Sequence, residues 1–193
     1  MACGNPGKIR EIARLLDGLG IEVVAQSEFG VTDADETGTT FVENSLIKSL
    51  HAADATGLPA IADDSGLVVD ALDGAPGIYS SRYSGPDATD DSNIDKLLAA
   101  MKDIERSDRG ATFQCAASFV LPDRAQSLVA EGEWRGSILT ARQGDGGFGY
   151  DAVFLDPESG ASAASLTAEQ KNARSHRGQA LRKLVALIEQ QFS

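Results

Sequence analysis

Residues 60–72 read AIADDSGLVVDAL. The apolar residues 60–62 predict a brief strand that leads to Asp63 and Asp64, and the Val-rich residues 67–72 predict a second apolar segment. Two adjacent carboxylates repel each other unless a cation or a shared proton offsets the repulsion. The stretch therefore predicts either an acidic pair with a chemical role or a turn in which one acid caps the next element.

The N-terminal side of this stretch carries helical patterns. Apolar residues recur at helical spacing over residues 9–19, and a second helix is predicted over residues 41–56 because a GLP stop follows at residues 57–59. Between the two helices, residues 21–25 predict a short strand. The acidic and aperiodic residues 29–40 predict a loop.

The C-terminal side adds more strands and helices. Residues 112–121 and 127–134 predict two antiparallel strands joined by a turn, and residues 152–155 predict another strand. Thr167 and Gln170 form a capping box at the start of a helix. The alternation of strands with helices indicates an α/β protein, and the hairpin indicates that its sheet is mixed.

The composition is that of a globular protein with a buried core. The chain has 193 residues, of which 42% are hydrophobic and 24% charged, and its formal net charge is −12. This charge argues against a broad nucleic-acid footprint, which requires a basic surface. No apolar run approaches the roughly 20 residues that cross a bilayer, and no secretory signal pattern is present, so we expect a cytoplasmic protein without membrane contact.

Two further features suggest phosphate chemistry. GNPGK, residues 4–8, opens into a helix, and glycine N–H groups at a helix N-terminus favour phosphate binding together with Lys8. Its spacing differs from that of a Walker A loop, and a plain loop before a helix is the alternative. Asp35 and Glu36, together with the acidic pair, could bind Mg²⁺, a hard cation that bridges to phosphates, while one carboxylate accepts a proton from water.

Two segments near the C-terminus carry groups suited to a nucleobase. In GGFGYD, Phe148 or Tyr150 could stack on a base, and Asp151 could accept hydrogen bonds from it. In SHRG, His176 and Arg177 are hydrogen-bond donors between two helical stretches. Core packing of the aromatic rings and a structural histidine are the alternatives.

Six segments in one order resemble the inosine triphosphate pyrophosphatase family over nearly the whole chain. They are CGNPGK, ETGTTFVENSLIK, IADDSGLVVDAL, GAPGIYSSRYSG, GGFGYD and LTAEQKNARSHRGQAL. The resemblance implies a long mixed sheet flanked by helices, in a single domain of residues 1–193 that has two lobes and a central cleft. It also implies a homodimer and Mg²⁺-dependent hydrolysis of the purine nucleotides ITP, dITP and XTP to the monophosphate and pyrophosphate.

The resemblance implies which residues bind the nucleotide. Those that cradle the triphosphate, including a nearby lysine, are Cys3, Gly4, Asn5, Pro6, Gly7, Lys8 and Lys48. Those that hold the rest of the nucleotide, with a phenylalanine stacked on the base, are Ser65, Phe148, Gly149, Tyr150, Asp151, Lys171, His176 and Arg177. Donors aimed at a C6 carbonyl would favour hypoxanthine and xanthine over adenine by about 10⁴-fold, because buried donors left unpaired are costly.

The resemblance also divides the acidic residues. Asp64 is expected to be the proton acceptor that activates water, with Asp63 supporting it. The expected ligands of the Mg²⁺ cofactor are Asp35, Glu36 and Asp64.

The sequence departs from the family pattern near its start. Family members carry an apolar strand before the glycine loop, whereas only Met1 and Ala2 precede Cys3 here, so the start is set late or most of one strand is missing. Cys3 stands where threonine or serine is usual, which leaves a hydroxyl–phosphate contact open. A milder departure is Ala152 after FGYD, where proline is common.

Two other functions are alternatives. A Maf-like pyrophosphatase would act on other modified or pyrimidine nucleotides, and the purine-facing SHRG and FGYD segments disfavour it. A non-catalytic nucleotide-binding protein would bind ITP without releasing pyrophosphate. The presence of both carboxylates and every expected cation disfavours this second alternative.

Overall fold

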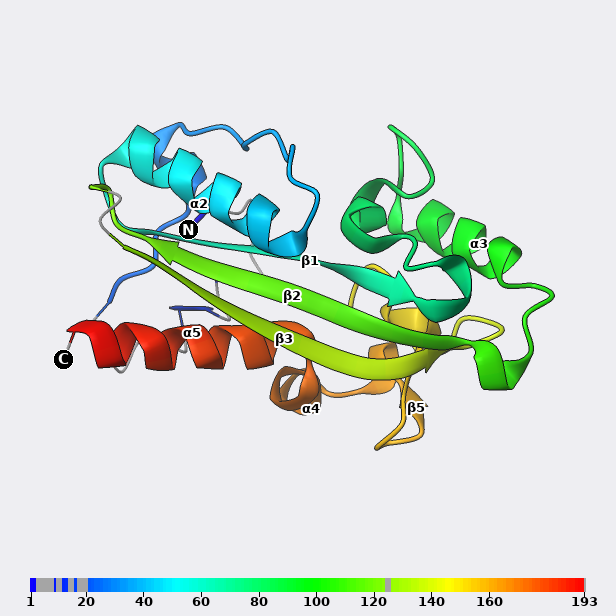
Figure 1. The fold of residues 1–193 in the computed structure, drawn as a ribbon. Coiled ribbons are helices and arrows are strands. Elements are labelled where there is room, and N and C mark those ends of the chain that lie inside the picture. The colour runs from blue at the N-terminus through cyan, green and yellow to red at the C-terminus, as the bar shows by residue number, and fades with distance from the viewer. Residues whose placement is uncertain (3–8, 10–11, 14–15, 17–20, 124–125, 193) are drawn as a thin grey trace. The chain divides into compact units, whose positions relative to one another are not determined.

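The computed structural model describes residues 1–2, 9, 12–13, 16, 21–123 and 126–192. Figure 1 shows the helices and strands along the chain, with short 3-10 helices named η in the text. In chain order the elements are η2 (Gln26–Phe29), α2 (Phe41–Thr56), β1 (Ala60–Val69), η3 (Asp70–Leu72), η4 (Gly77–Arg82), α3 (Asp90–Ala100), η5 (Arg106–Asp108), β2 (Gly110–Val120), β3 (Ser127–Ile138), η6 (Asp151–Val153), β4 (Phe154–Asp156), β5 (Ala161–Ser162), η7 (Ala163–Ser165), α4 (Ala168–Arg174) and α5 (His176–Phe192).

The described strands form one sheet in the order β1-β2-β3-β4-β5. Strands β1, β2 and β3 alternate in direction (Figure 1). Strand β4 is antiparallel to both β3 and β5, with Leu155 opposite Ser137 on one side and opposite Ser162 on the other. The α/β class and the predicted hairpin are therefore confirmed, and these five strands form the antiparallel part of the predicted sheet.

Helix α2 has the bounds that the sequence predicts. At its start the Thr40 hydroxyl accepts a hydrogen bond from the Glu43 N–H at 3.1 Å, which satisfies one of the free N–H groups of the first turn. At its end Gly57 adopts a left-handed conformation with φ 68°, which favours glycine. Local signals at both ends therefore fix this helix, which carries Lys48.

Residues 21–25 do not form the predicted strand. In the described part of the chain, the Met1 ammonium donates to the Val24 carbonyl at 2.6 Å, and the Gln26 N–H donates to the Met1 carbonyl at 2.9 Å. Among the described residues, Met1 alone pairs with the backbone of this segment in this way, and one residue is too short for a strand ladder. Within the described ranges, no helix combines the length and the apolarity of a membrane span.

The chain divides into two compact units. Unit 1 comprises Met1–Asp64, Cys115–Gly132 and Arg177–Ser193. Unit 2 comprises Ser65–Gln114 and Glu133–His176. Strands β1, β2 and β3 each contribute one part to each unit, and the chain passes from one unit to the other within two of the predicted site segments, DDSG and SHRG.

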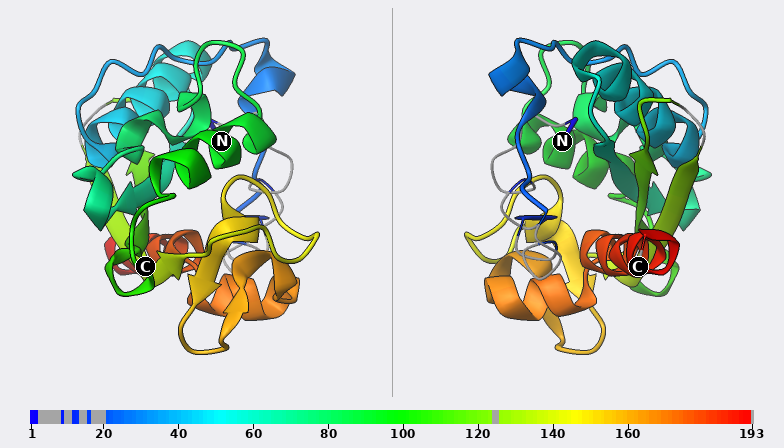
Figure 2. Two further views of the ribbon diagram at one scale, coloured as in Figure 1. Left: turned by 90° about the vertical axis from the view of Figure 1, so that its right-hand side faces the viewer. Right: turned by 90° about the vertical axis from the view of Figure 1, so that its left-hand side faces the viewer.

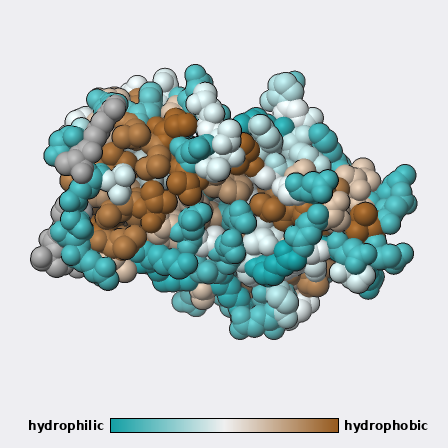
Figure 3. Space-filling view, in the orientation of Figure 1, coloured by the Kyte–Doolittle hydropathy of each residue, from teal (hydrophilic) through white to brown (hydrophobic). Residues whose placement is uncertain are grey.

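Unit 1 packs its strands between two helices. In Figures 1 and 2, α2 lies on one face of these strands and α5 on the other. Ala60 and Ala62 of β1 belong to an apolar cluster with α2, whereas Ile61 packs against the cluster of α5 residues that includes Leu181 and Leu184. Because side chains alternate along a strand, consecutive residues of β1 face different helices. On the surface shown in Figure 3, an apolar area lies on the left, where unit 1 is drawn.

Unit 2 has a separate core rich in aromatic residues. The Phe154 ring lies 4.5 Å from the Phe113 ring and 5.0 Å from the Trp134 ring, between ring centroids. The Trp134 indole N–H donates to the buried Asp156 carboxylate at 3.1 Å, so the polar end of this large side chain is satisfied. This core supports the segments that carry the predicted base-binding residues.

Candidate active site

Asp63 and Asp64 lie in the middle of β1 and not in a turn. The ten-residue strand continues through both of them, so the alternative of a capping turn is wrong. Alternation along the strand points Asp64 to the same face as Ala60 and Ala62, toward α2, and Asp63 to the face of α5. The two adjacent carboxylates are therefore separated, and each has its own cationic partner.

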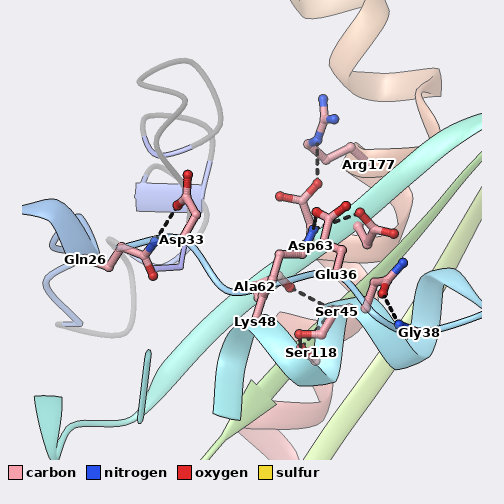
Figure 4. Close-up of polar contacts among 12 residues, drawn as sticks. Gln26, Asp33, Glu36, Gly38, Ser45, Lys48, Ala62, Asp63, Ser118 and Arg177 are labelled. Carbon is pink, nitrogen blue, oxygen red and sulfur yellow. Dashed lines mark hydrogen bonds and ion pairs between the residues drawn. The ribbon is translucent and has the colours of Figure 1, made fainter. Parts of the chain in front are cut away.

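On the α2 face, Asp64 belongs to a chain of three charged side chains, of which Lys48 and Glu36 are labelled in Figure 4. The Lys48 ammonium lies 2.7 Å from Asp64 Oδ1 and 3.1 Å from Glu36 Oε1, and donates a hydrogen bond to each. The Lys48 side chain is 15% exposed and that of Asp64 is 11% exposed. We name these three residues, Glu36, Lys48 and Asp64, the carboxylate–lysine cluster.

A glycine brings Glu36 to this cluster. The Gly38 N–H donates to Asn44 Oδ1 at 2.8 Å, which folds the loop of residues 31–40 back onto the first turn of α2 (Figure 4). A Cβ atom at Gly38 would lie 2.7 Å from both Asn44 Oδ1 and Glu43 Cβ, closer than real side chains approach. Only glycine therefore permits this approach, and no signal in the sequence points to Asn44 as part of the site.

The environment of Asp64 suits a proton acceptor. Burial raises the pKa of Asp64 above its ordinary value; Lys48 offsets part of this rise, and Glu36 adds to it. A base whose pKa is closer to neutral pH takes a proton from water more readily. Burial works to lower the pKa of Lys48, but the neighbouring carboxylates, above all Asp64, outweigh it, so the pKa of Lys48 is raised and the side chain stays charged.

On the α5 face, Asp63 pairs with Arg177. Arg177 Nε lies 3.2 Å from Asp63 Oδ2 (Figure 4), and the exposed fractions of the two side chains are 8% and 0%. Arg177 lies in the first turn of α5, so the ion pair joins this helix to β1 within unit 1. A fully enclosed carboxylate in an ion pair is better suited to holding an arginine than to meeting a water molecule.

The predicted metal ligands are only partly assembled. Glu36 and Asp64 meet at the same ammonium, and Asp64 Oδ2 is buried and has no hydrogen-bond partner among the described residues. Asp35 is exposed, and the described side chains form no group of three or more acidic, histidine or cysteine residues suited to a metal ion. Since Mg²⁺ commonly takes one or two carboxylates and completes its shell with phosphates and water, the Glu36–Asp64 pair fits that cation.

In unit 2, three of the predicted base-binding residues form a second group. The Phe148 ring is 49% exposed, and the Lys171 ammonium lies 4.6 Å from its centroid. The buried Asp151 carboxylate pairs with Lys171 and accepts a hydrogen bond from the Phe148 N–H at 2.9 Å. Asp151 thus holds both the exposed ring and the cation in place.

The remaining predicted residues of GGFGYD have structural contacts. Gly149, with φ 57°, donates its N–H to Asp90 Oδ2 at 2.7 Å, a partner that the sequence analysis missed. The Tyr150 ring is buried in the core of unit 2, and its hydroxyl donates to the Ser80 carbonyl at 2.8 Å. Burial raises the pKa of the Tyr150 hydroxyl, which keeps it protonated. Phe148 is therefore the aromatic residue of this segment with a ring available to a base.

His176 and Ser65 lie at two of the points where the chain passes from one unit to the other. His176 begins α5 and stacks on Phe113, with ring centroids 4.8 Å apart and planes 9° from parallel. Ser65 is half-buried on β1. No signal in the sequence points to Phe113. An aromatic residue in an apolar strand looks the same whether it supports His176 or only fills the core.

The predicted phosphate loop lies outside the described residues. It consists of Cys3, Gly4, Asn5, Pro6, Gly7 and Lys8.

Comparison with known proteins identifies the family. The family model described as the Ham1 family matches residues 1–187. The chain is 54% identical over 186 residues to a dITP/XTP pyrophosphatase of Pectobacterium atrosepticum, which covers 96% of this chain and 94% of that protein. It is 55% identical over 186 residues to a dITP/XTP pyrophosphatase of Photorhabdus laumondii, with the same coverage of 96% and 94%.

Solved structures agree with the sequence comparison. A HAM1 protein from Coxiella burnetii superposes with a TM-score of 0.92 at 46% identity and covers 97% of this chain and 96% of its own. The Ham1 protein of Staphylococcus aureus gives a TM-score of 0.90 at 41% identity, with coverage of 98% and 97%. The resemblance carried by the six sequence segments is thus confirmed, and the chain belongs to the Ham1 family.

Proposed function

We propose that this protein hydrolyses the non-standard purine nucleotides dITP, ITP and XTP to the nucleoside monophosphate and pyrophosphate, which removes them from the nucleotide pool. The observation that carries the proposal is the carboxylate–lysine cluster, in which a buried carboxylate of raised pKa lies against a charged lysine. The names of the curated relatives, dITP/XTP pyrophosphatases, support the substrate class.

In the proposed reaction, Asp64 accepts a proton from the attacking water. The new bond joins the water oxygen to phosphorus, and the anhydride bond that releases pyrophosphate breaks. Glu36 and Asp64, with Asp35 on the same loop, would hold Mg²⁺, which when bound neutralises charge on the phosphates. Lys48 and the loop of residues 3–8 bind the triphosphate, and Asp63 orients Arg177.

We assign recognition of the base to Phe148, His176 and Arg177. Phe148 stacks on the base, and Lys171 and Asp151 hold Phe148 in place. The exposure of Phe148 and its contacts with these two residues support the arrangement. His176 and Arg177 donate hydrogen bonds to the C6 carbonyl of hypoxanthine or xanthine. Adenine carries an amino donor there, so the same two groups would remain unpaired.

We also propose a cytoplasmic homodimer. The proposed substrates are free nucleotides of the cytoplasm, which supports that location. The apolar area on unit 1 (Figure 3) supports association with a second copy. Light scattering coupled to size-exclusion chromatography tests this, because a monomer at all concentrations contradicts it.

A nucleotide panel scored by pyrophosphate release, with and without Mg²⁺, tests the proposed reaction. We expect dITP, ITP and XTP to be hydrolysed far faster than ATP or GTP, and only with the metal. Equal turnover of the four standard nucleotides contradicts the proposal. A preference for pyrimidine or other modified nucleotides indicates a Maf-like activity instead, and binding of ITP without pyrophosphate release indicates a non-catalytic protein.

A further inference from the structure

The carboxylate–lysine cluster already contains a cation, the ammonium group of Lys48. Lys48 Nζ donates to Asp64 Oδ1 at 2.7 Å and to Glu36 Oε1 at 3.1 Å, so a single ammonium bridges two carboxylates that come from different segments. The side chains of Lys48, Glu36 and Asp64 are 15%, 27% and 11% exposed, which limits screening of these charges by water. These two carboxylates are also the ones to which we assign the divalent metal.

Lys48 and a divalent cation therefore compete for the same oxygens. With Lys48 in place, one of the two negative charges is neutralised, and a metal ion beside it would be repelled at a distance of a few ångströms. Lysine is a point charge on a flexible four-carbon stem, so it can exchange one anionic partner for another. A triphosphate offers such a partner with a higher charge than either carboxylate.

We propose that Lys48 occupies the cation site of the nucleotide-free protein and that phosphate binding draws it away, which opens the Glu36–Asp64 pair to the metal. This inference rests on the proposed function of the same site. It makes metal and nucleotide binding cooperative, because each favours the state in which Lys48 has left the carboxylates, and such coupling is reciprocal. The nucleotide-free protein then binds divalent cations weakly, although it carries both carboxylates.

Titration of the nucleotide-free protein with Mn²⁺, followed by electron paramagnetic resonance of the free ion, tests the inference. Lys48→Met removes the competing charge while it keeps the aliphatic stem, and we expect Mn²⁺ to bind about ten- to a hundredfold more tightly than in the wild type. Lys102→Met removes an exposed lysine beside Asp103, 74% exposed, and is the matched control for the change in net charge. It should leave Mn²⁺ affinity unchanged.

A second pair of variants locates the site that Lys48→Met exposes. The added affinity should disappear in the double variants that combine Lys48→Met with Glu36→Gln or with Asp64→Asn. Lys48→Gln, which keeps a polar but uncharged head group, should show the same gain in Mn²⁺ affinity. It keeps the test valid if the methionine variant does not fold. Thermal unfolding of each variant, with and without Mn²⁺, provides a second readout of the same binding.

The outcomes separate this inference from the proposed function. Equal Mn²⁺ affinity in folded wild-type, Lys48→Met and Lys48→Gln proteins overturns the competition, and so does weaker binding in the variants. If pyrophosphate release from ITP still requires Mg²⁺ in that case, the proposed function stands without the inference. If the variants gain affinity but the wild type hydrolyses no nucleotide, competition for the cation site stands and the proposed function fails.

Discussion

Replacement of Asp63 by Asn is expected to destabilise the protein strongly, because it breaks an enclosed ion pair. The Asp63 and Arg177 side chains are 0% and 8% exposed and lie 3.2 Å apart. Removal of one partner of a buried pair leaves the other charge uncompensated and costs about 3–5 kcal/mol. For a chain of this length each kcal/mol lowers the melting temperature by about 2–4 °C, so we expect a fall of about 6–20 °C.

Differential scanning calorimetry and urea unfolding measure this loss. The double variant Asp63→Asn, Arg177→Met removes both charges and should be more stable than Asp63→Asn alone, because no charge is left buried without its partner. Asp64→Asn is the control on the neighbouring residue. When the charge of Asp64 is removed, Lys48 keeps Glu36 as a second anionic partner at 3.1 Å, so Asp64→Asn should destabilise the protein by less than Asp63→Asn does.

Two results would refute the reasoning on Asp63. One is an Asp63→Asn variant whose free energy of unfolding lies within about 0.5 kcal/mol of the wild type, the range of ordinary surface changes. The other is a double variant whose loss equals the sum of the two single losses, since this indicates no coupling between the side chains.

Three further predictions concern the supports of the site. Gly38→Ala places a Cβ 2.7 Å from Asn44 Oδ1 and should cost about 1–3 kcal/mol in urea unfolding, whereas an unchanged midpoint contradicts the close approach. Phe148→Ala should raise KM for ITP with little change in kcat or in melting temperature, because the ring is 49% exposed, and steady-state kinetics that show an unchanged KM exclude base stacking. Burial works to raise the pKa of Asp156, but hydrogen bonds, including one from the Trp134 indole, lower it overall. The Asp156 carboxylate therefore stabilises the fold fully above the ordinary carboxyl pKa, and this stabilisation is lost as the pH falls through the lowered pKa. Unfolding of Asp156→Asn measured across acid pH should accordingly show a smaller loss of stability on acidification than the wild type, and an identical loss contradicts this role.

The sequence predicts elements that have local signals at both ends. Helix α2 is the clearest case, since the Thr40 cap and Gly57 define its limits. The prediction of a strand at residues 21–25 is wrong, because a short apolar run does not by itself show that a strand forms. The alternative of a turn at Asp63–Asp64 rests on how unusual two adjacent acids are inside a strand. Their ion pairs with Lys48 of α2 and Arg177 of α5 make both acids tolerable there.

The site shows the same division between local and long-range information. The motifs and the family resemblance predict Asp64, Lys48 and Arg177 as site residues, but they do not predict which of these side chains pair. Alternation along β1 separates the two acids, and this could be inferred only once the strand was known to continue through them. Phe113, which stacks on His176, acts through a contact between residues far apart in the chain, and no spacing in the sequence predicts such a contact.

The central claim is that Asp64 is the proton acceptor, and pyrophosphate release from ITP by Asp64→Asn in the presence of Mg²⁺ tests it most directly. Loss of a general base predicts a fall in kcat of about 10²–10⁴-fold in a variant that remains folded at the assay temperature and still binds ITP. A variant that keeps kcat within a few-fold of the wild type contradicts the claim and removes Asp64 from the catalytic role.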